Sequence, residues 1–309
     1  METRPIGSLS VSLVGIGCNN FGGRIDAAAT QAVVDTALDE GINFFDTADT
    51  YGGTQSEVLL GQALGSRRDE VIIATKYGMG DGTKLPAGAS AASVATAVEG
   101  SLRRLGTDRI ELYQLHVPDD KTPIDETLEA MDRLVRDGKV LEIGCSNFDG
   151  ARLDEAASAA EKHGTARFAS VQNELSLLRR RHEADLLEAA QRHDLAILPY
   201  FPLASGMLTG KYHRGEPPPE GTRLAGRPAD DRALSDKRFD VIEALDAFAR
   251  ERGHTLLELA MSWLASLPNL ASVIAGATKP EQVKANAAAV AWKLTADERR
   301  EIEALAPAR

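Results

Sequence analysis

The sequence has little of what several large classes of protein depend on. It contains two cysteines, Cys18 and Cys145, among 309 residues, which is too few for a disulfide framework or a four-thiolate metal site. No apolar run reaches the roughly 18 residues that a membrane-spanning helix needs, and the chain does not begin with a basic and then apolar leader. We therefore expect a cytoplasmic protein with no membrane partner.

A surplus of positive charge is also absent. The chain has 35 Lys and Arg against 46 Asp and Glu, which gives a formal net charge of −11 at pH 7. A protein that follows nucleic-acid phosphates needs concentrated Lys and Arg, so nucleic acid is not an expected partner. With 43% hydrophobic and 26% charged residues, the composition is that of a globular protein with a sizeable core.

The familiar nucleotide and metal motifs are incomplete. Gly15-Ile16-Gly17 is followed by Asn20 where the dinucleotide fingerprint requires a third glycine. The stretch 206–212 resembles a phosphate loop, but it is one residue too short between its glycines and has Tyr212 where Ser or Thr must ligate Mg²⁺. The six histidines include no His-x-His pair. We expect neither a Rossmann turn, nor a P-loop, nor a metal site.

Two alternating periods run through the chain. Apolar, often β-branched runs predict strands of a parallel sheet buried on both faces; they cover residues 14–17, 43–46, 71–76, 110–116, 140–146, 169–173, 196–200 and 271–274. Amphipathic stretches between them predict helices, the clearest at 27–40, 91–105, 125–137 and 182–193. Eight strand and helix repeats at this length predict an α/β protein, a (β/α)₈ TIM barrel forming a single domain over residues 1–309.

Two segments depart from a bare barrel. Residues 6–11 predict a short hairpin with its turn at Gly7-Ser8, placed to close the bottom of the barrel. After the seventh strand, residues 203–235 are rich in Gly and Pro and show no sustained period. Such a loop is either a functional lid on the catalytic face of the barrel or a disordered excursion.

Polar side chains stand at the ends of consecutive predicted strands. Asp46 closes the second strand, Tyr51 follows it, Lys76 closes the third strand and His116 closes the fourth. A phenol can donate a proton to a carbonyl oxygen, and a nearby ammonium is expected to lower its pKa from about 10 toward neutrality. Asp46 would hold Lys76 charged, and His116 would hydrogen-bond the carbonyl oxygen or relay the proton.

Each of these residues also has a purely structural interpretation. Asp46 can bond turn amides, Tyr51 can pack on the rim, Lys76 can be a solvated strand end, and His116 can be a core histidine. A barrel requires none of these residue types at consecutive strand ends, so their combination favours a catalytic site.

Four segments then identify a resemblance. Residues 45–52 (FDTADTYG), 75–78 (TKYG), 112–116 (LYQLH) and 144–148 (GCSNF) resemble the aldo-keto reductase family, and the likeness covers nearly the whole chain. It implies a (β/α)₈ barrel that binds a nicotinamide cofactor in extended form without a Rossmann fold. It also implies a catalytic tetrad, with Tyr51 as the general acid, made of Asp46, Tyr51, Lys76 and His116.

The resemblance further implies the cofactor contacts. Ser146, Asn147 and Gln172 match residues that bind the nicotinamide carboxamide, and Tyr200 would stack on the ring. Residues 200–206 resemble the pyrophosphate loop, with Phe201 where Ser is common, and 274–282 together with Asn286 resemble the adenosine pocket. The complete expected set is Ser146, Asn147, Gln172, Tyr200, Phe201, Leu203, Ser205, Gly206, Lys211, Gly276, Thr278, Lys279, Gln282 and Asn286.

The adenosine segment departs from the family pattern in one respect. Some members have Arg at the position of Gln282 and a basic residue at that of Gly276, so Lys279 is expected to contact a 2′-phosphate in their place. We therefore expect NADPH, with NADH as the alternative. Thr278 and Glu281 also fit a helix capping box, and a helix N-terminus attracts phosphate, so both interpretations can hold.

These expectations define a function but no substrate. We expect an NADPH-dependent oxidoreductase that reduces a small aldehyde or ketone to an alcohol. Two alternatives stay open: a cofactor-binding, redox-sensing accessory subunit with slow turnover, like the potassium-channel β subunits of the family, or a dehydrogenase that mainly oxidises alcohols. A barrel hydrolase would need a metal. The expected substrate pocket lies on loops, which set specificity without revealing it, and comprises Asn20, Phe21, Tyr77, Met79 and Val117. The sequence gives no oligomeric state.

Overall fold

The computed structural model describes residues 1–181, 183–228 and 231–308. Within them, eight parallel strands form one sheet in the order β10-β3-β4-β5-β6-β7-β8-β9. Ile197 of β9 donates its N–H to Asn269 O (2.8 Å) and accepts from Ala271 N–H (3.0 Å), which joins β9 to the chain entering β10. The sheet therefore closes into the predicted barrel. Its strands are β3 (Val14–Gly17), β4 (Phe44–Asp46), β5 (Ile72–Tyr77), β6 (Ile110–Leu115), β7 (Val140–Ser146), β8 (Ser170–Glu174), β9 (Ala196–Tyr200) and β10 (Val273–Gly276).

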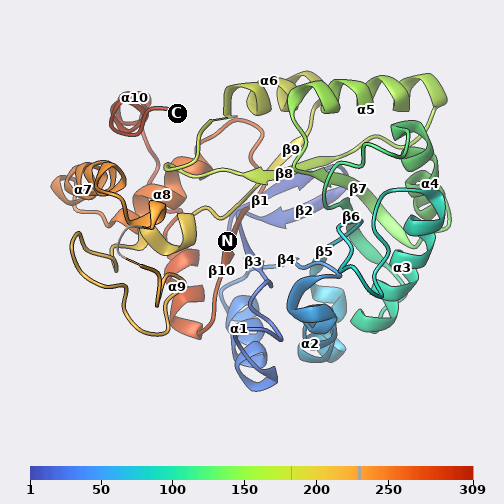
Figure 1. Ribbon diagram of the computed structural model, residues 1–309, viewed down its shortest axis with the longest axis horizontal. Coiled ribbons are helices and arrows are strands. Elements are labelled where there is room, and N and C mark those ends of the chain that lie inside the picture. The colour runs from blue at the N-terminus through green and yellow to red at the C-terminus, as the bar shows by residue number, and fades with distance from the viewer. Residues whose placement is uncertain (182, 229–230, 309) are drawn as a thin grey trace.

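Helices surround this barrel (Figure 1). They are α1 (Ala27–Asp39), α2 (Gln55–Leu64), α3 (Ala91–Leu105), α4 (Ile124–Arg136), α5 (Gly150–His163), α6 (Glu183–His193), α7 (Asp236–Glu251), α8 (Leu256–Ala265), α9 (Pro280–Ala288) and α10 (Ala296–Leu305). The four predicted helices agree with α1, α3, α4 and α6, except that His182, the first residue predicted for α6, lies outside the described residues. Among those described, no helix is long and apolar enough to span a membrane.

The barrel wall has two differently packed faces, because alternate residues of a strand point to opposite sides. Phe44, Ala74, Leu112 and Leu198 belong to a cluster inside the barrel, and a larger cluster fills the layer between the strands and the helices. Residues two positions along each strand share a face, so Asp46, Lys76 and Gln114 continue the inner face toward the carboxyl ends of β4, β5 and β6. The same alternation sends their neighbours toward the helices.

A hairpin closes the other end of the barrel. β1 (Thr3–Ile6) pairs antiparallel with β2 (Leu9–Ser12) across the predicted Gly7-Ser8 turn, where Gly7 has a φ of +54°. Ile6, Leu9 and Val11 pack into the cluster inside the barrel. The hairpin is longer than the predicted 6–11, because its outer residues are polar or exposed and leave no apolar signal.

The described part of the long connection after β9 contains turns and two short 3₁₀ helices. These are η3 (Ala204–Thr209) and η4 (Arg232–Leu234). Tyr212 and Leu224 are buried, and the Tyr212 hydroxyl accepts a hydrogen bond from Leu224 N–H (3.3 Å). The connection is thus anchored in the core at these points while residues 213–217 are exposed.

Candidate active site

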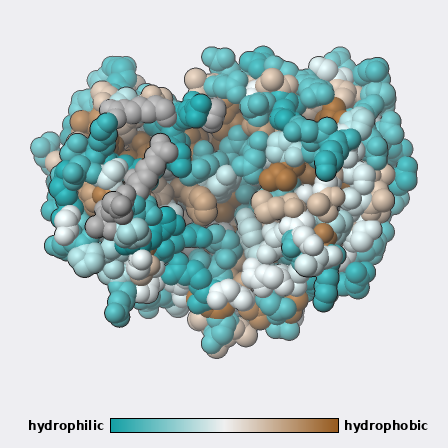
Figure 2. Space-filling model, viewed as in Figure 1, coloured by the Kyte–Doolittle hydropathy of each residue, from teal (hydrophilic) through white to brown (hydrophobic). Residues whose placement is uncertain are grey.

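The carboxyl ends of the strands surround a cavity of about 560 Å³. Asp46, Tyr51 and His116 line it, together with side chains from the β3–α1 connection, the long loop after β9 and helix α9. Figure 2 shows one face of the molecule hollowed near its centre, with hydrophobic and hydrophilic residues side by side around the hollow. The predicted strand-end residues therefore meet in one place.

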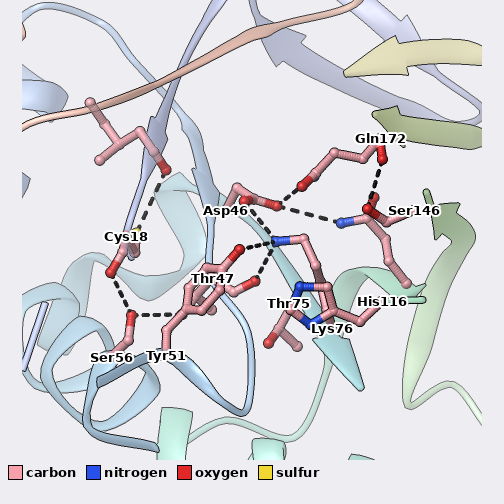
Figure 3. A network of polar contacts seen from close by, with 12 residues as sticks. Cys18, Asp46, Thr47, Tyr51, Ser56, Thr75, Lys76, His116, Ser146 and Gln172 are labelled. Carbon is pink, nitrogen blue, oxygen red and sulfur yellow. Dashed lines mark hydrogen bonds and ion pairs between the residues drawn. The ribbon is translucent and has the colours of Figure 1, made fainter. Parts of the chain in front are cut away.

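Lys76 forms the buried centre of this site (Figure 3). Its side chain is 0% exposed, and Nζ donates to Asp46 Oδ2 (2.8 Å), Thr47 O (2.8 Å) and Tyr51 Oη (3.4 Å). Burial works to lower the pKa of Lys76, but the charge and hydrogen bond of Asp46, with the contact to Tyr51, raise it above its ordinary value. Lys76 is thus a cation at neutral pH, and it is directed at the phenol.

Asp46 is held on both oxygens. Besides the ion pair, its Oδ1 accepts from Gln172 Nε2 (2.8 Å) and from Gln114 Nε2 (3.5 Å). Gln114 was not among the predicted site residues, although strand alternation could have found it, since it lies two residues before His116 on β6. Hydrogen bonds on both oxygens offset the cost of burying this carboxyl group.

Tyr51 is placed by a tight turn. It begins the 3₁₀ segment η1 (Tyr51–Thr54), in which Gly52 has a φ of +58°. A Cβ at Gly52 would lie 2.4 Å from Phe21 O, so only glycine fits this close approach.

The pKa of Tyr51 moves in the direction opposite to the prediction. Burial raises it above 10, and the nearby Lys76 ammonium only reduces that rise. Desolvation of the phenolate outweighs the attraction to one ammonium that is itself neutralised by Asp46. The phenol therefore keeps its proton at neutral pH, which is the form that a proton donor needs.

His116 is a neutral imidazole at neutral pH. Its ring lies edge-to-face with Tyr51, 5.8 Å between centroids, and burial together with the charge of Lys76 lowers its pKa to about 3. It can therefore hydrogen-bond a carbonyl oxygen but cannot carry an extra proton at pH 7. Asn147 Nδ2 donates to its backbone carbonyl (2.9 Å), which ties the ends of β6 and β7 together.

Most residues expected to bind the cofactor line the same cavity. These are Ser146, Asn147, Gln172, Tyr200, Phe201, Leu203, Ser205, Gly206, Lys211, Gly276, Thr278, Gln282 and Asn286. Asn147 has a φ of +63°, a conformation that costs a non-glycine residue energy and is common at functional sites. Its Oδ1 accepts from Tyr200 Oη (2.8 Å).

Lys279 is the exception. It is exposed, does not line the cavity, and is the N-cap of α9. The predicted Thr278–Glu281 capping box is wrong, because Gln282 Oε1 accepts instead from Thr278 N–H (2.7 Å) and Oγ1 (3.1 Å). The helix begins one residue later than that motif assumes, at Pro280.

The predicted substrate pocket is partly wrong. Asn20 and Met79 line the cavity, whereas Phe21 and Tyr77 are 0% exposed in the core and Val117 lies outside the lining. Tyr77 follows Lys76 on β5 and so points to the opposite side of the wall, where it stacks on Tyr113 with 4.8 Å between centroids.

The structure adds two cationic side chains that the sequence did not single out. Arg24, from the β3–α1 connection, lines the cavity and donates to Gly221 O (2.9 Å). Arg223, from the long loop, also lines it and lies over the Phe201 ring at 4.9 Å. Their placement depends on how the long loop folds back, which no local pattern encodes.

No cluster of three or more His, Cys, Asp or Glu side chains capable of holding a metal ion occurs in the described part of the chain.

Comparison with known proteins agrees with this geometry. The model of the aldo/keto reductase family matches residues 13–307. The chain is 38% identical to "Uncharacterized oxidoreductase YrpG" of Bacillus subtilis, over 89% of this chain and 86% of that protein. It is 33% identical to "Aldo-keto reductase YhdN" of the same organism, over 96% and 90%. It is also 33% identical to the "Probable voltage-gated potassium channel subunit beta" of Arabidopsis thaliana, over 94% and 91%. With its barrel and these similarities, the chain belongs to the aldo/keto reductase family and is an oxidoreductase of that family.

Proposed function

We propose that this enzyme uses NADPH to reduce an aldehyde or ketone to the corresponding alcohol, with Tyr51 as the general acid. The observation that carries the proposal is the Asp46–Lys76–Tyr51 chain, which directs a buried ammonium at a protonated phenol on the wall of a large cavity.

The residues around the cavity fit a nicotinamide dinucleotide. Ser146, Asn147 and Gln172 offer amide and hydroxyl groups for a carboxamide, and Tyr200 offers an aromatic face. In the loop after β9, consecutive residues 204–206 have φ values of +46°, +60° and +90°. Ala204 N–H donates to Phe201 O (2.9 Å) and Gly206 N–H to Leu203 O (2.8 Å), so these turns hold Ser205 on the cavity wall, where its hydroxyl would meet a pyrophosphate.

The cations near this loop support the phosphorylated cofactor. Lys211, Arg24 and Arg223 line the cavity, although the whole chain carries a net charge of −11. Lys279 is exposed next to Thr278, which lines the cavity, and it would contact the 2′-phosphate. The cavity cations would attract the pyrophosphate that both cofactors carry, and NADH, which lacks the 2′-phosphate, would lose only the contact with Lys279.

When bound, the reduced nicotinamide supplies a hydride to the carbonyl carbon. Side chains of the enzyme then act on the carbonyl oxygen. Tyr51 donates its phenolic proton to that oxygen, Lys76 stabilises the phenolate left behind, and Asp46 keeps Lys76 oriented. Neutral His116 hydrogen-bonds the carbonyl and so orients it toward Tyr51.

A second candidate is a redox-sensing accessory subunit that binds cofactor but turns over slowly. It is favoured by the similarity to the plant protein named as a potassium channel β subunit. Turnover distinguishes the two, because an accessory role predicts tight cofactor binding with rates far below those of a metabolic reductase.

The test is a panel of aldehydes and ketones assayed with NADPH and with NADH, followed at the nicotinamide absorbance. We expect steady turnover of at least one carbonyl class with NADPH and weaker activity with NADH. Tight NADPH binding without turnover of any carbonyl or alcohol would replace the reductase proposal by the accessory role.

A further inference from the structure

A second buried polar cluster lies on the outer side of the barrel wall, behind the segment 47–51 that leads to Tyr51. Its centre is Glu57 of α2, which is 0% exposed. Glu57 accepts from Thr75 Oγ1 of β5 (2.6 Å) and from Arg104 Nε of α3 (2.6 Å). This carboxylate is therefore paired and hydrogen-bonded.

Asp49 shares the burial of Glu57 but not its partners. Its side chain is 0% exposed, and no side chain among the described residues donates to either carboxyl oxygen; the N–H of Thr50 is a backbone donor beside it. The backbone of Asp49 is tied to β5, since Asp49 N–H donates to Lys76 O (3.1 Å). An ionised carboxylate buried without a partner is strongly unfavourable.

The charges around Asp49 leave one negative charge without a counterpart. The groups that act on it are Glu57 from α2, Arg104 from α3, Lys76 from β5 and the N–H of Thr50; the Tyr113 phenol of β6 lies within the same electrostatic group. Lys76 is already paired with Asp46 and Arg104 with Glu57. A proton on Asp49 would neutralise the cluster.

The pKa of Asp49 agrees with this count. Burial raises it to about 7, the charge of Glu57 adds to the rise, and Arg104, the Thr50 N–H and Lys76 offset part of it. The carboxyl group is therefore largely protonated below neutral pH and becomes ionised above it.

The same segment positions the proton donor. Thr47 N–H donates to Ala74 O (2.8 Å), Asp49 N–H donates to Lys76 O, and Thr47 O accepts from Lys76 Nζ. Tyr51 follows two residues after Asp49, and its hydroxyl lies 3.4 Å from Lys76 Nζ. A charge on Asp49 would draw its side chain toward water and away from Glu57, turning this segment and lengthening that contact.

Building on the proposed function, we propose that Asp49 is a positioning residue: its neutral carboxyl group, buried beside Glu57, keeps segment 47–51 where Tyr51 faces Lys76. Ionisation of Asp49 then separates the proton donor from its ammonium and slows the proton transfer.

The direct test needs no catalysis. The protein has five tyrosines, so ring-¹³C-tyrosine labelling gives a simple spectrum, and loss of one signal in Tyr51→Phe assigns Tyr51. We expect the Tyr51 signal of the wild type to shift with a midpoint near pH 7 and to stay fixed in Asp49→Asn. A Tyr51 signal that does not move between pH 5 and pH 9 in the wild type overturns the proposal, even if Asp49→Asn does not fold.

The kinetic test separates positioning from simple structural support. In single turnovers with saturating NADPH, the wild-type rate should fall about tenfold per pH unit once Asp49 is ionised. Asp49→Asn, which mimics the neutral group, should keep the rate to higher pH, and Asp49→Ala should lose rate at every pH with the Kd for NADPH unchanged. Asp120→Asn, an exposed aspartate with the same change of charge, is the control and should follow the wild type.

The two proposals fail separately. Parallel pH profiles for wild type and Asp49→Asn, in an active reductase, overturn the role of Asp49 alone. A Tyr51 signal that follows Asp49 in a protein without carbonyl turnover supports the positioning and overturns the proposed function.

Discussion

The floor of the cavity and its rim hold their side chains in different ways. On the floor, Asp46 and Lys76 extend from barrel strands, are buried, and have every charge partnered. On the rim, Arg24 and Arg223 extend from loops, are exposed, and contact a backbone carbonyl and an aromatic ring. Strands place the groups that act on the reacting atoms, where small displacements are costly, whereas loops place groups that only bind.

The largest difference between floor and rim is expected when the proton donor on the floor is removed. Tyr51→Phe should lower the rate of carbonyl reduction roughly 10²- to 10⁴-fold, the usual value of general acid catalysis, with unchanged NADPH binding because only a hydroxyl is lost. Stopped-flow hydride transfer and a fluorescence titration of NADPH measure the two effects. Tyr212→Phe removes the same atom from the long loop, where the hydroxyl contacts backbone only, and is the matched control. Equal effects of the two variants would contradict the assignment of Tyr51.

The ion pair on the floor should matter for stability as well as rate. Lys76→Met leaves Asp46 buried without its cation, and breaking a buried pair costs about 3–5 kcal/mol. It also removes the ammonium beside the phenol, so the pKa of Tyr51 should rise further. Urea unfolding measures the first effect and the alkaline limb of the pH–rate profile the second.

An exposed ion cluster is the comparison for that variant. Arg214 pairs with Asp236, Asp240 and Glu243 near the surface, where water and salt screen the charges. Arg214→Met should therefore change unfolding little. A Lys76→Met protein as stable as Arg214→Met would show that the floor tolerates an unpaired carboxylate and would end the contrast between the two regions.

The sequence predicted the floor better than the rim. Apolar runs located every barrel strand, and residue types at strand ends located Asp46, Tyr51, Lys76 and His116. Strands buried on both faces have no polar alternation, so nothing local showed that Lys76 points inward and Tyr77 outward. The sequence also could not show whether the pKa of Tyr51 is raised or lowered, because the direction depends on whether burial outweighs the charge of Lys76. Predicting the position of Arg223 would have required knowing that a loop from far along the chain returns over the cavity.

The rim should respond to cofactor where the floor does not. Residues 219–223 are largely exposed, and a hydrogen bond from Arg24 to Gly221 O connects them to the β3–α1 connection. We expect trypsin to cleave after Arg223 in the free protein and several-fold more slowly with saturating NADPH. Cleavage after exposed Lys84, in the β5–α3 connection outside the cavity lining, serves as the internal control. Equal protection at both sites, or at neither, would mean that the long loop is not a cofactor-dependent lid.

The smallest expected effect concerns the choice between the two cofactors. Lys279 caps α9 outside the cavity lining, where its ammonium can face a 2′-phosphate at the N-terminus of the helix. A solvent-accessible contact of this kind is weakened by water and salt, so Lys279→Ala should weaken NADPH binding only several-fold. NADH binding should not change, because NADH lacks that phosphate.

Arg223→Ala provides the contrast, since Arg223 lines the cavity beside the pyrophosphate-type loop. Arg223 would contact the part that both cofactors share, so its removal should weaken the binding of NADPH and of NADH alike. Titrations of both cofactors into wild type and the two variants, repeated at high salt, separate these contacts. If Lys279→Ala leaves the preference for NADPH over NADH unchanged while Arg223→Ala abolishes that preference, the 2′-phosphate is bound by the rim of the cavity and not by the start of α9.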